Sequence, residues 1–412
     1  MFSLLFALAM AAIAPTPPMG WNSWDSYGTT VTEAEVKANA DFMAAKMKSH
    51  GWEYIVVDIQ WSDPQAKAHG YRANAELTMD DQGRLTPAVN RFPSAAGGKG
   101  FGPLAAYIHS KGLKFGIHIM RGVPRRAAVA AEIGDPNSIC RWNSDMYGVD
   151  MEKPGGQAYY DSIVKLYAGW GVDYIKADDM AQPLHAPEIV ALHKAIVKSG
   201  RPIVLSLSPG PADLTKADFY AANANLWRVS GDLWDRWQDI RKTFPLMEKW
   251  SKYSKPGGWP DADMLPLGHI GIRAERGIDR MSLLTHDEQQ TLMTLWCISR
   301  SPLMVGGDLP TSDNLTVSLL TNDEVLAVNQ HATNSRQVSA TGDQIVWEAD
   351  GPAGQKYVAL FNTAETPQSV QISRTGTVAQ DLWSHHQVAV PTDGRFMVPP
   401  HGARLLAFPA AR

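Results

Sequence analysis

Aspartates stand at the ends of apolar runs through the first three quarters of the chain. Asp58, Asp178 and Asp232 each close such a run, and Asp261 and Asp263 lie within another. A carboxylate in an apolar run must be desolvated and paired, so it is costly to place there without a role. Grouped carboxylates can supply a nucleophile and a general acid or base. Helix capping explains any single aspartate of this kind, but it explains the whole set poorly.

The sequence Lys176-Ala177-Asp178 is the strongest local indication of chemistry. Side chains alternate along a strand, so Lys176 and Asp178 point to the same side. A cation two residues before a carboxylate favours its ionised form, which a nucleophile requires. The alternative is a buried ion pair between Lys176 and Asp178 that has only a structural role.

Asp232 is the natural partner of this carboxylate. It follows Arg228 and is flanked by Trp227 and Trp234. Apolar aromatic surroundings raise the pKa of a carboxyl group and suit a general acid. Two carboxylates of different character beside aromatic platforms are typical of glycoside hydrolysis.

The elements that must position these residues repeat one unit, a helix, a glycine and a strand. The unit occurs four times between residues 30 and 210, and its first helix begins at a capping box, Thr32 to Glu35. With the later apolar runs, eight strands are predicted: 19–25, 54–61, 114–120, 173–178, 202–208, 225–232, 258–265 and 302–308. Alternating helices and apolar strands predict an α/β fold, and eight strands favour a closed (β/α)8 TIM barrel. Catalytic groups of such barrels lie at the carboxyl ends of the strands.

The pattern changes near residue 330. Short alternating apolar runs, separated by Gly, Pro and Asp turns, continue to the end of the chain. These runs predict a small C-terminal antiparallel β-sandwich domain. The expected domains are therefore a barrel over residues 15–329 and a β domain over residues 330–412.

Residues 1–14 form an uncharged apolar run that ends in Ala-Ile-Ala, as signal peptides do, so export to the periplasm or the extracellular space is expected. The remaining sequence has no run long enough to span a membrane. The 38 basic and 42 acidic residues leave no basic field for a nucleic acid. Two cysteines, Cys140 and Cys297, exclude a disulfide scaffold and are either one bridge or two free thiols.

Four motifs carry a resemblance to a known family. They are Met19-Gly-Trp-Asn-Ser-Trp24, Lys176-Ala-Asp178, Trp227-Arg228 leading to Asp232, and Gly257-Gly-Trp-Pro-Asp-Ala-Asp-Met264. Together they resemble the family 27 glycoside hydrolases, which include α-galactosidases and α-N-acetylgalactosaminidases. The resemblance runs in the same order from about residue 15 to 330, and the β domain is similar in position and size to the family's C-terminal domain.

The resemblance implies a retaining double displacement, with Asp178 as nucleophile and Asp232 as acid/base. Retention places two such carboxyl groups about 5–5.5 Å apart. The implied sugar contacts are Trp24 under the ring, Asp58 at the outer hydroxyls, Lys176 at the 3- and 4-hydroxyls, Arg228 at the 2-hydroxyl, and Asp263 as a further pocket acid. No metal or organic cofactor is needed. The expected partner is an oligosaccharide or glycoconjugate, and a homo-oligomer stays open.

The sequence departs from the family pattern where sugar identity is read. Galactose-specific members carry two adjacent acids after the second strand, but here Asp58 is followed by Ile59 and Gln60. Ser208 replaces the bulky or acidic residue expected after the fifth strand, and His118 stands where an aromatic residue is common. Since a missing polar partner changes specificity strongly, the glycone stays open.

The resemblance favours an exo-acting α-galactosidase. The alternatives with the same mechanism are an α-N-acetylgalactosaminidase, a β-L-arabinopyranosidase and an isomalto-dextranase-like enzyme. A metal-dependent barrel hydrolase and a non-catalytic carbohydrate-binding protein are the alternatives of other classes. Of the 14 tryptophans, Trp24, Trp227 and Trp259 fall in motifs at the expected barrel mouth, and the others are expected to pack in the interior.

Overall fold

The computed structural model describes residues 13–72 and 74–410. The predicted signal peptide lies outside these residues, except for Ile13 and Ala14. The backbone carbonyl of Ala14 accepts hydrogen bonds from the Gly257 amide at 2.8 Å and from the Trp259 indole at 3.0 Å.

Eight parallel strands form one curled sheet in the order β10-β9-β8-β7-β3-β2-β1-β13. Their bounds are β1 Met19–Asn22, β2 Tyr54–Val57, β3 Lys114–Met120, β7 Tyr174–Asp178, β8 Val204–Leu207, β9 Leu226–Arg228, β10 Trp259–Asp261 and β13 Leu303–Val305. A parallel bridge between Leu265, four residues after the end of β10, and Val305 of β13 brings the two edges of the sheet together. The predicted α/β barrel is therefore confirmed, and each of the eight strands lies within its expected range.

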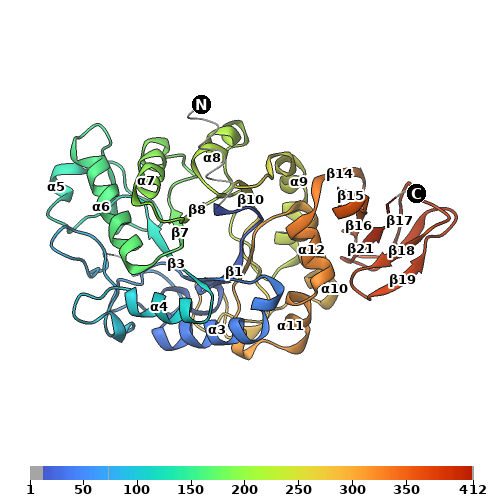
Figure 1. The fold of residues 1–412 in the computed structure, drawn as a ribbon, viewed down its shortest axis with the longest axis horizontal. Helices are drawn as coiled ribbons and strands as arrows, with labels where there is room; N and C mark the ends of the chain where they lie inside the picture. Colours follow the sequence, from blue (N-terminus) through green and yellow to red (C-terminus); the bar gives the residue numbers. More distant parts are fainter. Residues whose placement is uncertain (1–12, 73, 411–412) are drawn as a thin grey trace.

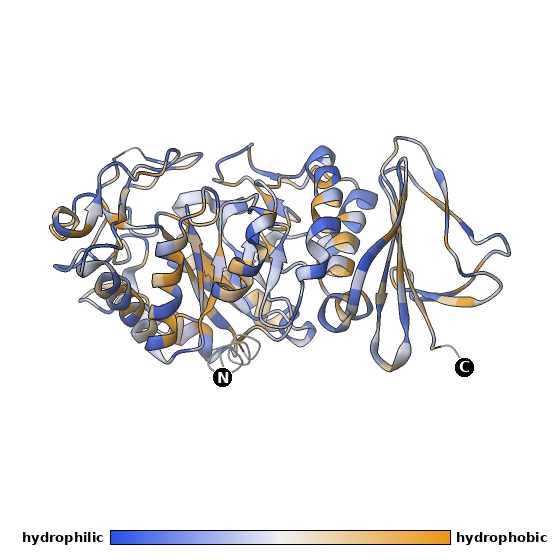
Figure 2. Cartoon of the chain, turned by 90° about the horizontal axis from the view of Figure 1, so that it is seen from above, coloured by the Kyte–Doolittle hydropathy of each residue, from blue (hydrophilic) through white to orange (hydrophobic). Residues whose placement is uncertain are grey.

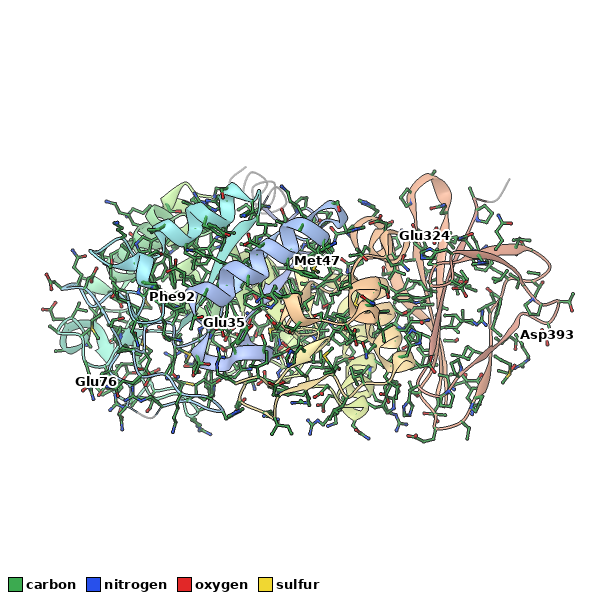
Figure 3. The ribbon with its side chains drawn as sticks, turned by 90° about the horizontal axis from the view of Figure 1, so that it is seen from below. Glu35, Met47, Glu76, Phe92, Glu324 and Asp393 are labelled. Carbon is green, nitrogen blue, oxygen red and sulfur yellow. The ribbon has the colours of Figure 1, made fainter. Side chains whose placement is uncertain are left out.

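Helices surround this sheet (Figure 1). The capping box at Thr32 and Glu35 begins α3, and left-handed Gly171 and Gly200 end α6 and α7. Figure 3 shows α3 along its full length, with Glu35 in its first turn and Met47 directly after its last residue. The helices are α2 Trp24–Tyr27, α3 Glu33–Lys46, α4 Gly102–Ser110, α5 Ala130–Ile133, α6 Gly155–Trp170, α7 Ala186–Ser199, α8 Ala217–Asn223, α9 Trp237–Trp250, α10 His286–Ser299, α11 Asn314–Leu320 and α12 Asp323–His331.

The strands of the barrel are apolar, and hydrophobic residues colour its interior in Figure 2. All four residues of β2 are buried, as expected for a parallel sheet covered on both faces. At Gly20 in β1, a Cβ atom would lie 2.6 Å from the Tyr54 carbonyl oxygen, so only glycine allows this approach of β1 to β2.

Short strand pairs lie in the loops of the barrel. They are β4 Val123–Pro124 and β5 Gly134–Asp135, which both pair with β6 Met146–Val149, and β11 His269–Ile270, which pairs with β12 Arg280–Met281. The loops that hold them are long and carry part of the cavity described below.

The C-terminal part is an antiparallel β-sandwich, as predicted. Its larger sheet has the order β14-β15-β16-β21-β18-β19, and β17 and β20 form the second sheet. The bounds are β14 Thr333–Thr341, β15 Gln344–Asp350, β16 Lys356–Asn362, β17 Gln368–Gln371, β18 Val378–Asp381, β19 His386–Ala389, β20 Arg395–Val398 and β21 Ala403–Phe408. In Figure 1 this domain lies at one end of the molecule, next to α10 and α12.

Two details differ from the sequence-based expectation. Strand β9 ends at Arg228, so Asp232 lies in the following loop and not at a strand end. The rings of Trp227 and Trp259 are fully buried, with Trp227 beside Trp250 and Trp259 beneath the guanidinium group of Arg300, and neither lines the barrel mouth. Their motif position placed them at the mouth, but alternation along the strands turns them toward the helices.

The two cysteines are buried free thiols, which decides between the alternatives left open by the sequence. Among the described residues, no helix is both long and apolar enough to cross a membrane.

Candidate active site

A cavity of about 280 Å³ opens at the carboxyl ends of the barrel strands. Its lining is Trp24, Asp25, Tyr71, Trp142, Lys176, Asp178, Ser208, Pro209, Gly210, Arg228, Asp232, Leu233, Trp234, Asp263, Met264, Glu275 and Arg276. Six of the predicted site residues are among these, and the seventh, Asp58, lies directly behind Lys176. The volume is near the lower end of the range for ligand sites, about 300–1,000 Å³, and suits one sugar ring.

Asp178 ends β7 and is held through both of its carboxylate oxygens. The backbone amide of Asp179 donates to Oδ1 at 3.0 Å, and His118 Nε2 lies 3.1 Å from Oδ2. Burial alone would raise the pKa of Asp178, but the hydrogen bond from His118 and the charges of His118 and Lys176 outweigh burial and hold it below its usual value. Asp178 is therefore an ionised, oriented carboxylate.

A buried ionic network fixes the backbone behind Asp178. Asp179 has a left-handed conformation with φ of 58°, which is strained for a residue other than glycine. Its carboxylate binds Arg121 at 2.8 Å, and Arg121 also binds Glu188 at 2.6 Å. Glu188 in turn accepts a hydrogen bond from Tyr160 at 2.6 Å. The network holds Asp179 in the conformation that points its amide at Asp178.

Asp58 follows β2 and forms a second buried ion pair. Its Oδ2 accepts hydrogen bonds from Lys176 Nζ at 2.8 Å and from the Asn22 side chain at 2.8 Å. Burial raises the pKa of Asp58, but the charges of Lys176 and His118 overcome this and hold it well below its usual range. The resemblance assigned Asp58 to sugar hydroxyls, but its carboxylate is buried behind Lys176 and is not among the residues that line the cavity.

Arg228 links the carboxylates on the other side of the cavity. Its guanidinium group lies 3.1 Å from Asp232 and 2.8 Å from Asp263. Asp263 also accepts a hydrogen bond from the Leu233 amide at 2.7 Å. Burial and the nearby charges of Asp232 and Asp261 raise the pKa of Asp263 to about 7, against the opposing effect of Arg228.

Asp232 is the most open of these acids. Its side chain is 47% exposed, whereas that of Asp178 is 14% exposed. The predicted apolar aromatic surroundings of Asp232 are therefore wrong in part, because Arg228 binds it and only Trp234 of its two neighbouring tryptophans lines the cavity. An open carboxyl group at the mouth can exchange protons with a leaving group and with water.

Aromatic rings continue from the bottom of the cavity to its rim. The ring of Trp24 stacks on that of Tyr71, with centroids 5.5 Å apart, and Tyr71 lies 5.5 Å from Trp142. Trp24 is buried and Trp142 is exposed. This row supplies the apolar surface on which the C–H face of a sugar can lie.

Residues of the cavity that the sequence analysis missed come mainly from long loops. Tyr71 lies in the loop after β2, Trp142 in the loop between β5 and β6, and Glu275 and Arg276 between β11 and β12. The length of these loops was the available signal in the sequence, because the loops that follow barrel strands carry the functional residues of such folds. Asp25 was also missed; it lines the cavity, and its Oδ2 has no hydrogen-bond partner among the described residues.

Ile59 and Gln60, the departures noted in the sequence, are both buried. Ile59 belongs to the apolar core, and Gln60 has left-handed backbone geometry and donates to Asp145 at 2.8 Å. Neither residue places an acid beside Asp58. No three His, Cys, Asp or Glu side chains in residues 13–72 and 74–410 are arranged to hold a metal ion.

An eight-stranded barrel with an ionised carboxylate deep in a sugar-sized cavity and an open carboxyl group at its mouth is the arrangement that glycoside hydrolases use. Comparison with known proteins gives the family. The model of α-galactosidase A matches residues 16–331, and that of the α-galactosidase C-terminal β-sandwich domain matches residues 341–408. The chain belongs to family 27 of the glycoside hydrolases.

Individual relatives carry different sugar names. An α-galactosidase from Cyamopsis tetragonoloba is 32% identical over 92% of this chain and 82% of its own. A family 27 β-L-arabinopyranosidase from Geobacillus stearothermophilus is 51% identical, with a TM-score of 0.95 over 98% of both chains. A protein from Bacillus halodurans C-125, named provisionally an α-N-acetylgalactosaminidase, is 45% identical, with a TM-score of 0.86 over 96% of this chain and 98% of its own.

Proposed function

We propose that this protein is a retaining, exo-acting glycosidase that removes terminal β-L-arabinopyranosyl residues. The observation that carries the proposal is Ile59, a buried apolar residue where galactose-specific members of the family carry a second acid. β-L-Arabinopyranose has the ring configuration of α-D-galactopyranose at C1 to C4 but no hydroxymethyl group. A site without a partner for the 6-hydroxyl suits the sugar that lacks it.

The proposed mechanism uses the two carboxylates in turn. An oxygen of Asp178 attacks the anomeric carbon while Asp232 gives its proton to the departing glycosidic oxygen, which leaves a covalent ester between the sugar and Asp178. Asp232 then takes a proton from water, and the water oxygen displaces Asp178 with overall retention. The depressed pKa of Asp178 and the exposure of Asp232 support these roles.

The remaining polar groups of the cavity suit a pyranose ring. Lys176, which Asp58 holds in place, offers donors to adjacent hydroxyl groups, and Arg228 offers donors on the opposite side. Trp24 gives an apolar surface under the ring. The likeness to the Geobacillus stearothermophilus β-L-arabinopyranosidase, at 51% identity, supports the same choice of sugar.

A second candidate is α-galactosidase activity, the expectation from the family resemblance. The shared configuration at C1 to C4 lets an α-D-galactoside use the same contacts to Lys176 and Arg228. We expect slower turnover of the galactoside, because burying a hydroxyl group without a partner costs about 1–3 kcal/mol, which corresponds to about a 5- to 150-fold loss of kcat/KM.

The test is a comparison of 4-nitrophenyl β-L-arabinopyranoside, α-D-galactopyranoside and N-acetyl-α-D-galactosaminide, with the product anomer followed by NMR. We expect the highest kcat/KM for the arabinopyranoside, and retention. Ile59→Asp restores an acid next to Asp58 and should shift the ratio toward the galactoside, whereas Ile59→Val, the matched apolar control, should not. Preference of the wild-type enzyme for either galactose-based substrate would contradict the proposed sugar, and inversion would contradict the mechanism.

A further inference from the structure

Trp142 is the tryptophan with the most exposed side chain in the part of the chain that the structure describes. Twelve of the 14 tryptophans are buried, Trp383 is half-buried, and Trp142 is 39% exposed. An open indole leaves a large apolar area in water, which a ligand can cover. Trp142 lies at the rim of the cavity and continues the row of rings formed by Trp24 and Tyr71.

Two residues of opposite charge share the rim with this indole. Glu275 and Arg276 line the same cavity, and the Arg276 Nε atom lies 3.8 Å from a Glu275 carboxylate oxygen. Glu275 and the candidate acid/base Asp232 line the same cavity. Burial and the charge of Asp232 raise the pKa of Glu275, against the effect of Arg276.

The loops that carry these rim residues are tied together. The backbone amide of His69, two residues before Tyr71, donates to the carbonyl of Arg273 at 3.2 Å, and the His69 ring bonds the Ala274 carbonyl at 2.8 Å. These hydrogen bonds join the loop of Tyr71 to the loop of Glu275 and Arg276.

The position of the acid/base places the leaving group at the open side of the cavity. The acid/base must touch the departing oxygen, and Asp232 is much more exposed than the deeper Asp178. The group bonded to that oxygen then extends outward from Asp232, past Trp142, Glu275 and Arg276. The side chains of Glu275 and Arg276 are 31% and 52% exposed, so they belong to the open side of the cavity, as Trp142 does.

We propose that Trp142, Glu275 and Arg276 form a binding subsite for the leaving group, and that this group is an uncharged sugar residue. The proposal rests on the proposed glycosidase function. A pyranose has an apolar face, which stacks on Trp142, and an edge of hydroxyl groups, which both donate to Glu275 and accept from Arg276. The opposite charges cancel, so the subsite does not select an ionic leaving group.

The experiment compares two substrates that share the glycone and differ in the leaving group. β-L-Arabinopyranosyl fluoride releases an ion that cannot stack on Trp142, whereas a β-L-arabinopyranosyl disaccharide releases a sugar. For Trp142→Ala we expect kcat/KM for the disaccharide to fall about tenfold more than for the fluoride, which corresponds to about 1.4 kcal/mol. Trp142→Phe keeps an aromatic face and should lose much less. Val197→Ala, which trims an exposed apolar residue of α7 outside the cavity lining, is the control and should leave both substrates unchanged.

Equal losses on both substrates in Trp142→Ala would overturn the subsite, because they would show a general effect on the cavity. A Glu275→Gln, Arg276→Gln double variant with unchanged KM for the disaccharide would overturn the role of the charged pair. Failure of the wild-type enzyme to hydrolyse the fluoride and its α-D-galactosyl counterpart would instead overturn the proposed glycosidase function. If only the galactosyl substrates react, the same ratio measured on them tests the subsite independently of the proposed sugar.

Discussion

At the scale of single residues, the site consists of carboxylates whose surroundings set them apart. Asp178 is buried and held ionised by His118 and Lys176, Asp263 is shifted toward its neutral form, and Asp232 is open to solvent. Different protonation states at neighbouring carboxylates are what acid/base catalysis needs. The chemistry at this site is thus set by what each carboxylate touches, because the side chains are chemically identical.

Replacement of the nucleophile gives the most direct prediction. Asp178→Asn removes the attacking oxygen while keeping the side-chain shape, so we expect kcat for an aryl glycoside to fall at least about a thousandfold with little change in stability. Steady-state kinetics and a thermal melt measure the two effects. Asp218→Asn, an exposed aspartate on α8, is the matched control. Unchanged activity of Asp178→Asn would exclude the proposed mechanism.

The contact between His118 and Asp178 predicts a pH effect. His118→Phe removes a donor to a carboxylate, a bond that contributes about 1.5–3 kcal/mol. The pKa of Asp178 then rises, and because Asp178 acts in its ionised form, the acid limb of kcat/KM moves to higher pH by about one to two units.

His118→Gln keeps an uncharged donor at this position and should give a smaller move of the acid limb. Profiles of kcat/KM against pH for the wild-type enzyme and both variants decide the matter. An acid limb that stays in place in His118→Phe would show that this histidine does not set the ionisation of Asp178.

At the scale of elements, the sequence predicted the strands and missed the turns that follow them. The eight strands and the same-side placement of Lys176 and Asp178 follow from apolar runs and alternation, which are local properties. Asp179, Asp263 and Gln60 adopt positive φ just after strands. Aspartate adopts positive φ more often than most residues, but residue type alone does not show which aspartate or glutamine does so. Such strain is held by contacts distant in sequence, so it is visible only in the folded chain.

The buried ion pairs of Arg121 with Asp179 and Glu188 are expected to stabilise both the fold and the position of Asp178. Arg121→Met keeps the length of the side chain but leaves Asp179 and Glu188 without their buried cation. We expect the free energy of unfolding to fall by about 3–5 kcal/mol. We also expect kcat to decrease more than KM changes, since the Asp179 amide then loses its fixed direction toward Asp178.

Urea denaturation and steady-state kinetics measure the two effects of Arg121→Met. Arg126→Met, which breaks an exposed pair with Glu76, is the control and should change stability by no more than about 1 kcal/mol. Equal effects of the two variants would show that the buried network does not support the nucleophile.

At the scale of the whole molecule, the β-sandwich is part of the barrel's core and not an appendage. Alternate residues of β16 face opposite ways: Tyr357, Ala359 and Phe361 join the core of the barrel, whereas Val358 and Leu360 join the smaller core of the sandwich. Figure 3 shows Glu76 and Asp393 at opposite ends of the elongated molecule that results. The period-two pattern predicted these strands, but a sheet with both faces buried could not be distinguished from one with a face in solvent.

Because the two domains share one core, we expect them to unfold together. The Phe361 ring lies 5.0 Å from that of Phe244 on α9, and the His401 ring stacks on Trp237 at 4.1 Å. Phe361→Ala leaves a cavity at this junction and should lower the free energy of unfolding by about 3–5 kcal/mol. Hydrogen exchange with mass spectrometry along a urea series should then show peptides of β2 and of β16 losing protection at the same lowered midpoint.

Phe396→Ala provides the contrast, because Phe396 belongs to the smaller core of the sandwich. We expect peptides of β17 and β20 to lose protection first in this variant, while β2 keeps the wild-type midpoint, since local openings follow the contacts that are removed. If Phe361→Ala lowered the midpoint of β16 alone, the barrel would be stable without the sandwich. The shared core would then be a docking surface between independently folding domains, and the cavity of the barrel would not depend on the C-terminal domain for its stability.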